Sequence, residues 1–133
     1  MNDPSNLDCR FLRCRIRSKL MPILENVDKR FKNSVHKTNL RMSELKDLIN
    51  KLANENIDFE NKRVVLAKFI ESHMVIKQTI VSKILSCCNY NDSNVTGSLL
   101  DEIIRFANNK KSNLHKIGNI KVSKKNGFLI FKH

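Results

Sequence analysis

The side chains best suited to binding chemistry are basic, and they are concentrated in two segments of the chain. The net charge is +12 over 133 residues. Residues 9–19 and residues 109–133 both contain basic side chains and no acidic one, and the residues outside them are neutral overall. The first segment carries Arg10, Arg13, Arg15, Arg17 and Lys19, and the second carries Lys110, Lys111, Lys116, Lys121, Lys124, Lys125 and Lys132.

Positive charge segregated in this way favours binding to a polyanion, because each neutralised phosphate releases a condensed counterion. A surface that engages about six phosphates would give a log–log salt slope near −5. We predict that these basic residues, Lys132 not included, contact nucleic acid, either DNA or RNA. The alternatives are an acidic protein surface, an acidic membrane surface, or basic termini that are only solvated.

The cysteines and histidines are not spaced like the ligands of a known metal site. Cys9 and Cys14 are a loose match to a zinc-binding pair, and the adjacent Cys87 and Cys88 cannot easily ligate one ion from a helix. The four histidines form neither an HxxxH nor an HExxH pair. We predict reduced thiols, no metal and no cofactor.

The sequence offers little to catalysis. It contains three glycines, which excludes a P-loop or a dinucleotide-binding fingerprint. A nucleophilic Cys–His pair needs two residues brought together by the fold, which spacing alone does not test. His73 lies in an apolar-rich stretch, which is more typical of a core histidine than of a base. We predict that the protein is not an enzyme.

Location and origin are indicated by composition. The sequence has no run of 18 apolar residues, which predicts no transmembrane segment, and its first residues do not form a secretory signal. We expect an intracellular protein, cytoplasmic or nuclear. Asn, Lys and Ile make up 47 of the 133 residues, and their A/T-rich codons are typical of an A/T-rich genome such as that of a large insect DNA virus or a low-GC microbe.

The chain is organised around the apolar-periodic stretch of residues 58–88, which contains neither Gly nor Pro. Asp58 suits the N-cap of a helix, and apolar side chains follow at helical spacing. The pattern weakens over residues 71–76, where a break would give two helices and a helix-turn-helix outline with residues 77–85 as its recognition helix. The alternative is a core helix with a solvated polar face.

Further helices are predicted on both sides of this stretch. Residues 9–20 are interpreted as a helix, with an alternating strand as the alternative, and a second helix follows from Pro22 to about residue 34. A turn is expected over residues 35–39. The next helix, over about residues 40–54, carries a seam at nearly heptad spacing. The seam comprises Met42, Leu45, Leu48, Ile49 and Leu52, and it predicts packing inside the domain or between subunits.

The C-terminal part changes from helical to strand periodicity. A helix is predicted over about residues 96–109, followed by strands over 117–123 and 128–132. The Asn126-Gly127 pair between the strands is a strong β-hairpin indicator. This layout is similar to a winged helix with Lys124 and Lys125 at the tip of the wing. The alternative is a hairpin over residues 117–132 that only covers the core.

Together these patterns predict a mainly α protein: a disordered segment over residues 1–8 and one compact domain over residues 9–133. That domain should contain about five helices and a C-terminal β-hairpin. The predicted function is non-enzymatic docking on nucleic acid through the two basic segments. The alternative is an assembly factor, such as a viral structural, nucleocapsid-associated or egress protein, that binds proteins or a second copy through the helical seam.

Overall fold

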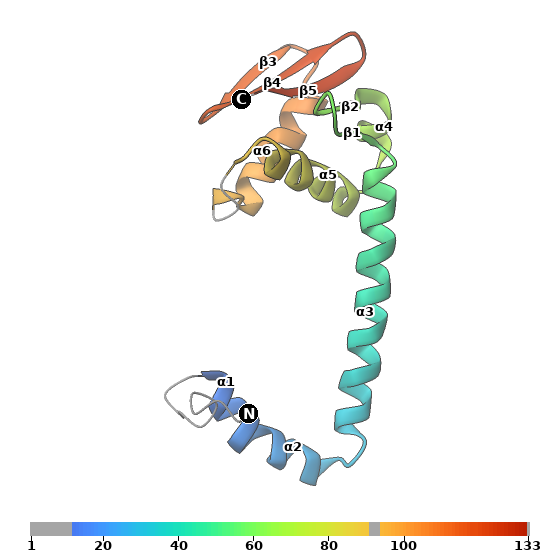
Figure 1. Ribbon diagram of the computed structural model, residues 1–133, viewed down its shortest axis with the longest axis vertical. Coiled ribbons are helices and arrows are strands. Elements are labelled where there is room, and N and C mark those ends of the chain that lie inside the picture. Colours follow the sequence, from blue (N-terminus) through green and yellow to red (C-terminus); the bar gives the residue numbers. More distant parts are fainter. Residues whose placement is uncertain (1–11, 91–93, 133) are drawn as a thin grey trace. The chain divides into compact units, whose positions relative to one another are not determined.

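The structure is a computed structural model, and it describes residues 12–90 and 94–132 (Figure 1). The chain divides into two units, residues 1–44 and residues 45–133. The boundary falls inside α3 (Phe31–Asn54), a single helix that belongs to both units. The single domain predicted over residues 9–133 stays a prediction. The predicted disorder of residues 1–8 lies outside the described residues.

Unit 1 is helical. It begins with α1 (Leu12–Arg15), the π-helical η2 (Ile16–Leu20) and α2 (Met21–Val27), which follow one another without a gap. The helix predicted over residues 9–20 is therefore confirmed where the structure describes it. Pro22 is the second residue of α2, which directly follows η2, so the helical backbone continues through a residue that has no N–H to donate. None of the described residues 12–44 is buried.

The turn predicted over residues 35–39 is wrong, because α3 is helical throughout that range. The segment contains no Gly or Pro that would interrupt a helix. The hydroxyl of Thr38 also donates to the Ser34 carbonyl at 2.9 Å, so this polar side chain is accommodated along the helix. The helix predicted to begin near residue 40 begins instead at Phe31.

The helix predicted to start at Asp58 is also wrong. This region forms two short antiparallel strands, β1 (Ile57–Asp58) and β2 (Arg63–Val65). The Asp58 carboxylate accepts from the backbone N–H of Asn61 at 3.1 Å and from Nε of Arg63 at 2.8 Å. The side-chain amide of Asn61 also donates to this carboxylate, at 2.9 Å. Of these hydrogen bonds it contributes most to lowering the pKa of Asp58. Asp58 thus holds the turn between the strands and does not cap a helix.

The central stretch, which the sequence left open as one helix or two, is broken within residues 71–76. The break separates α4 (Leu66–Glu71) from α5 (Met74–Cys87) at Ser72 and His73. The His73 ring accepts from the backbone N–H of Val75 at 3.4 Å, which caps α5. α5 buries Ile80, Val81, Ile84 and Leu85. One side of α5 therefore belongs to the core of unit 2.

The helix predicted over residues 96–109 is confirmed as α6 (Gly97–Asn108). The Thr96 hydroxyl accepts from the Leu99 backbone N–H at 3.3 Å and caps its first turn. The apolar face of α6 is buried and consists of Leu99, Ile103, Ile104, Phe106 and Ala107. These side chains form one core with those of α5.

The β-structure is larger than the predicted hairpin. β3 (Leu114–Ile117), β4 (Ile120–Lys125) and β5 (Phe128–Lys132) join β1 and β2 in a five-stranded antiparallel sheet of order β1-β2-β5-β4-β3. The strand predicted over residues 117–123 is interrupted after Ile117, where Gly118 has φ +54°. The predicted Asn126-Gly127 turn is confirmed, since both residues have positive φ. The fold is mainly α with an antiparallel sheet.

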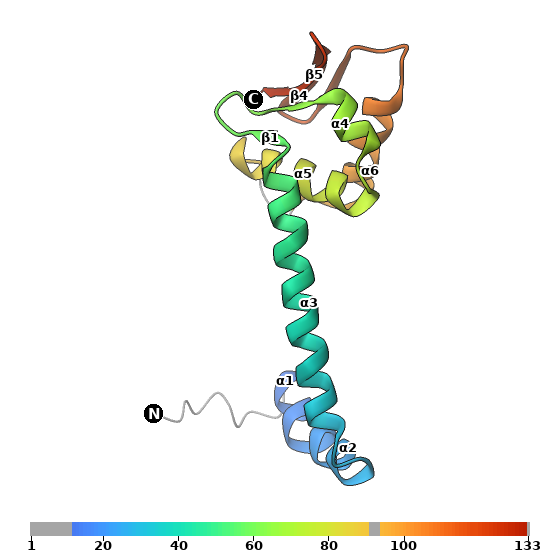
Figure 2. The ribbon, with the colours of Figure 1, turned by 90° about the vertical axis from the view of Figure 1, so that its right-hand side faces the viewer.

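One face of the sheet packs on the helices of unit 2. Buried strand residues such as Val64, Val122, Leu129 and Phe131 share the core with α5 and α6. Figures 1 and 2 both show the sheet stacked over these two helices. Among the described residues, no helix is long and apolar enough to cross a membrane.

Candidate nucleic-acid interface

The strands of the sheet present every second side chain on the face opposite the helices, here called the outer face. On β4, the buried Ile120 and Val122 alternate with Lys121 and Ser123. On β5, the buried Leu129 and Phe131 alternate with outward-facing residues in the same way. The outer face of β3, β4 and β5 consists of Leu114, Lys116, Lys121, Ser123, Lys125, Phe128, Ile130 and Lys132. Four of these eight residues are lysines, and none is acidic.

Three of the lysines lie side by side across three strands. Lys116 is directly opposite Lys121 between β3 and β4, and Lys121 is directly opposite Lys132 between β4 and β5. We call these three residues the lysine row, and all three are exposed. Directly opposed side chains have Cβ atoms about 5 Å apart, and like charges at this spacing destabilise a sheet. A bound polyanion would relieve that repulsion.

Apolar side chains follow the lysine row on the same face. Leu114 is opposite Ser123, and Ser123 is opposite Ile130. Leu114 is 62% exposed although it lies in a strand. Residues two apart in a strand are about 6.7 Å apart, so this second row is within side-chain reach of the lysines. The outer face therefore offers cations beside apolar surface.

A third row brings β2 into the same face. Lys125 is opposite Phe128, and Phe128 is opposite Val65 of β2. The guanidinium carbon of Arg63 lies 4.4 Å from the centre of the Phe128 ring, a cation–π contact. Arg63 and Asp58 are also paired, so this arginine joins the β1–β2 turn to the outer face.

Lys124 and Lys125 were both predicted at the tip of a wing, and the structure places them on opposite faces of β4. Lys125 is exposed on the outer face. Lys124 points toward α6, where its ammonium donates to the carbonyl of Phe106 at 2.8 Å and to the carbonyl of Asn109. The ammonium also lies 4.4 Å from the centre of the Phe106 ring. Desolvation at this position lowers the pKa of Lys124.

The other predicted site residues that the structure describes belong to elements other than the strands of the lysine row. Lys110 and Lys111 are exposed in the loop after α6, where the Lys111 backbone N–H donates to Asn109 at 2.9 Å. Arg10 lies outside the described residues. The remaining basic residues of the N-terminal segment are exposed on α1 and η2 of unit 1: Arg13, Arg15, Arg17 and Lys19.

Two basic residues of the outer face, Lys132 and Arg63, were not among the predicted site residues. The position of Lys132 could have been predicted from the sequence. A two-residue Asn-Gly turn places residue 125 opposite 128, and therefore residue 121 opposite 132. The position of Arg63 could not have been predicted in this way. Its segment was predicted to be helical, but it forms a strand that pairs with β5, more than sixty residues later in the chain.

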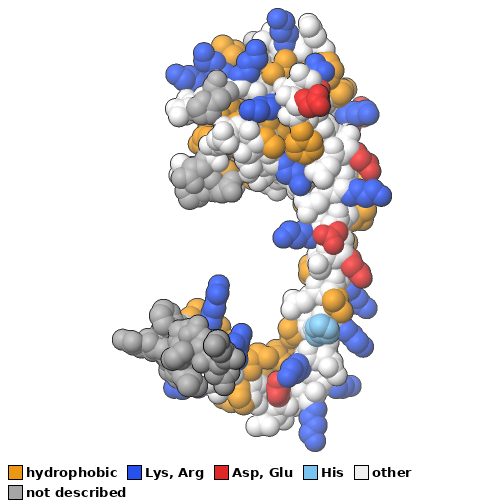
Figure 3. Space-filling view, in the orientation of Figure 1, with side chains coloured by type: hydrophobic (Ala, Val, Ile, Leu, Met, Phe, Trp, Pro, Cys, Tyr) orange, Lys and Arg blue, Asp and Glu red, His pale blue; other side chains and the backbone are white. Residues whose placement is uncertain are grey.

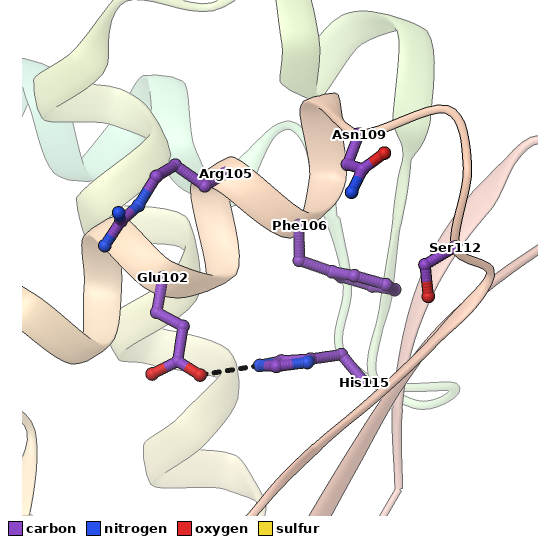
Figure 4. A pocket seen from close by; sticks show the side chains of 6 residues that line it. All are labelled: Glu102, Arg105, Phe106, Asn109, Ser112 and His115. Carbon is purple, nitrogen blue, oxygen red and sulfur yellow. Dashed lines mark hydrogen bonds and ion pairs between the residues drawn. The ribbon is translucent and has the colours of Figure 1, made fainter.

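A small hollow lies on the other side of the sheet, where α6 meets β3 (Figure 4). His115 Nε2 lies 2.7 Å from Glu102 Oε1, and the His115 ring stacks on Phe106 with 5.3 Å between ring centres. The hollow measures about 340 Å³. The hydroxyl of Ser112, which also lines it, donates to the Leu114 carbonyl at 3.0 Å. These contacts connect β3 to α6, and they orient the histidine against a carboxylate.

The cysteines of unit 2 lie at the end of α5. Cys87 is exposed and Cys88 is buried, and this burial raises the pKa of the Cys88 thiol. Cys9 lies outside the described residues. Within the part of the chain that the structure describes, no three Cys, His, Asp or Glu side chains are grouped as a metal site would require.

No model of a known protein family matches the sequence, and no curated protein shows significant similarity to it. Figure 3 shows Lys and Arg side chains gathered over the sheet of unit 2.

Proposed function

We propose that the protein is a non-enzymatic nucleic-acid-binding protein and that nucleic acid docks on the outer face of the sheet. The lysine row is the observation that carries the proposal. It holds three exposed, like-charged side chains in adjacent positions, with no acid on the outer face of the same three strands. Phosphates fit such a row because they neutralise the mutual repulsion of the lysines and release their own counterions.

The apolar neighbours of the row support nucleic acid over a simple acidic peptide. Bases can stack on or pack against aromatic and aliphatic side chains while the backbone phosphates meet the cations. Phe128, with Arg63 against its ring, and the exposed Leu114 provide such surface next to the lysine row. The predicted contacts Lys116, Lys121 and Lys125 belong to this surface, and Lys132 and Arg63 extend it.

The proposal is tested by replacing the lysine row with Lys116→Gln, Lys121→Gln and Lys132→Gln in one variant. Affinity for labelled DNA and RNA, single-stranded and duplex, is measured by fluorescence anisotropy at several salt concentrations. We expect affinity to fall about tenfold or more, and the log–log salt slope to become shallower by about 2 to 3.

The matched control removes three exposed lysines from helices of the same unit, by Lys46→Gln, Lys51→Gln and Lys68→Gln. It changes the net charge by the same amount but leaves the outer face intact. We expect its affinity to stay within about twofold of the unmodified protein, since long-range charge is screened over about 10 Å. Equal losses in both variants would mean that net charge, and not the outer face, governs binding.

The alternative function, protein assembly through the helical seam, is favoured by a specific observation on α3. Only Ala53 is buried among the 24 residues of this helix. Met42, Leu45 and Leu48 of the predicted seam are between 51% and 60% exposed, and Ile49 and Leu52 are half-buried. A helix with an apolar seam at heptad spacing is suited to packing against a second helix.

Sedimentation equilibrium with the Leu45→Asp variant tests this second function. If α3 packs against a second copy, the unmodified protein associates as concentration rises, and a buried aspartate at this d-type position weakens the association by at least about tenfold. Glu44→Asp on the neighbouring exposed position is the control. A monomer at the highest concentration would contradict self-association through the seam.

A further inference from the structure

The helical segment of unit 1 carries an apolar stripe that no described residue buries. Its members recur at intervals of three and four residues, which places them on one side of the helices α1, η2 and α2. They are Leu12, Ile16, Leu20, Ile23 and Val27. Each is between 39% and 80% exposed. We call these five residues the N-terminal stripe.

Basic side chains surround the N-terminal stripe. Arg13, Arg15, Arg17 and Lys19 are all exposed and lie between the first stripe residues, and the segment contains no acidic residue before Glu25. Long basic side chains can lay their apolar stems along a hydrocarbon surface while the charged ends reach lipid phosphates. A helix with an aliphatic side and a basic side is the type that lies in the plane of a membrane interface.

Other occupants fit this surface less well. Nucleic acid would neutralise the arginines, but its bases stack best on aromatic side chains, and the N-terminal stripe contains none. A second copy of the same segment would cover the stripe, but it would bring two sets of arginines together with no acid between them. An anionic lipid surface satisfies both properties at once, since its acyl chains accept the stripe and its headgroups accept the charge.

We propose that residues 12–27 bind in the plane of an anionic lipid membrane, with the N-terminal stripe inserted at the boundary between headgroups and acyl chains. The helix lies on the membrane and does not cross it. This activity is separate from nucleic-acid binding by the outer face of the sheet, because the two involve different residues in different units.

The test measures binding of the full chain to vesicles by flotation, with vesicles of phosphatidylcholine alone or with about 30% phosphatidylserine. We expect binding to the anionic vesicles to be at least about tenfold tighter than to the neutral ones. The variant Leu20→Asp with Ile23→Asp, which makes the stripe polar, should lose that binding by about tenfold or more. Its nucleic-acid affinity should stay within about threefold of the unmodified protein.

The matched control is Ser18→Asp with Asn26→Asp, which adds the same two negative charges at exposed positions outside the stripe. It should lose clearly less vesicle affinity than the stripe variant. Equal losses in the two variants would overturn the proposal, because charge alone would then explain binding. Absence of binding to anionic vesicles at low salt would also overturn it, as would a stripe variant that alters oligomeric state but binds vesicles normally.

Discussion

At the scale of single residues, Lys124 and Lys125 differ in what their ammonium groups contact, although they are adjacent in the sequence. Lys124 donates to two carbonyls at the C-terminal end of α6, and Lys125 is exposed on the outer face. A cation at this end of a helix adds a donor to the last carbonyls and interacts favourably with the helix dipole. Lys124 is therefore a structural residue of unit 2.

We predict that Lys124→Met lowers the free energy of unfolding by about 1 kcal/mol, because the carbonyls of Phe106 and Asn109 lose the hydrogen bonds from the ammonium while the apolar stem is kept. Lys125→Met removes the same charge from an exposed position and should change stability by less than about 0.5 kcal/mol. Urea unfolding of both variants measures the difference. Equal stability of the two variants would show that the Lys124 contacts contribute nothing.

At the scale of elements, the β4–β5 hairpin depends on the backbone conformation of its turn. Gly127 has φ +78°, which L-residues with a Cβ rarely adopt. This turn places Lys121 opposite Lys132, which is one of the two cross-strand pairs of the lysine row. Turn chemistry and the proposed binding surface are thus directly linked.

We predict that Gly127→Ala lowers the free energy of unfolding by about 1 to 2 kcal/mol, because the alanine Cβ is strained at positive φ. A Cβ added at either Gly127 or Gly97 would meet no atom within 4 Å, so only the backbone conformation distinguishes these two glycines. Gly97→Ala, in the first turn of α6, should leave stability unchanged or raise it by up to about 1 kcal/mol. Thermal and urea unfolding compare them, and a neutral Gly127→Ala would contradict the argument.

At the scale of the whole molecule, burial is distributed very unevenly. Every buried residue among those described belongs to residues 53–131, and residues 12–44 contribute none. Helices without buried side chains gain little from tertiary packing, and short helices are marginal in water by themselves. Stability should therefore differ along the chain.

Native-state hydrogen exchange tests this difference. We expect the backbone amides of residues 12–27 to exchange within about tenfold of unfolded-chain rates in the absence of a partner, and those in the middle of α5 and β4 to exchange at least about a thousandfold more slowly. A partner or membrane that covers the N-terminal stripe should slow exchange in residues 12–27. Equal protection in α2 and α5 would contradict the prediction.

The sequence by itself determined the features that depend on local chemistry. Helical spacing identified α6 and the seam of α3, and Asn126-Gly127 identified the last hairpin. The blurred pattern over residues 71–76 marked the place where a break was possible, and the break before α5 lies within it. Predictions from local sequence were wrong where pairing with a segment distant in the chain determines the secondary structure. Arg63–Val65 forms a strand because it pairs with β5, and Asp58 lies in β1 opposite Arg63 and accepts a hydrogen bond from it.

The candidate interface was predicted in part for the same reason. Segregated charge pointed to residues 109–133, and alternation within a strand can be read from the sequence. Only the tertiary structure decided which lysines share a face: it aligned Lys116, Lys121 and Lys132, added Arg63, and turned Lys124 inward to α6. Net charge is a sum over residues and is visible in the sequence, whereas a binding surface depends on strand register, which is set by contacts between segments far apart in the chain.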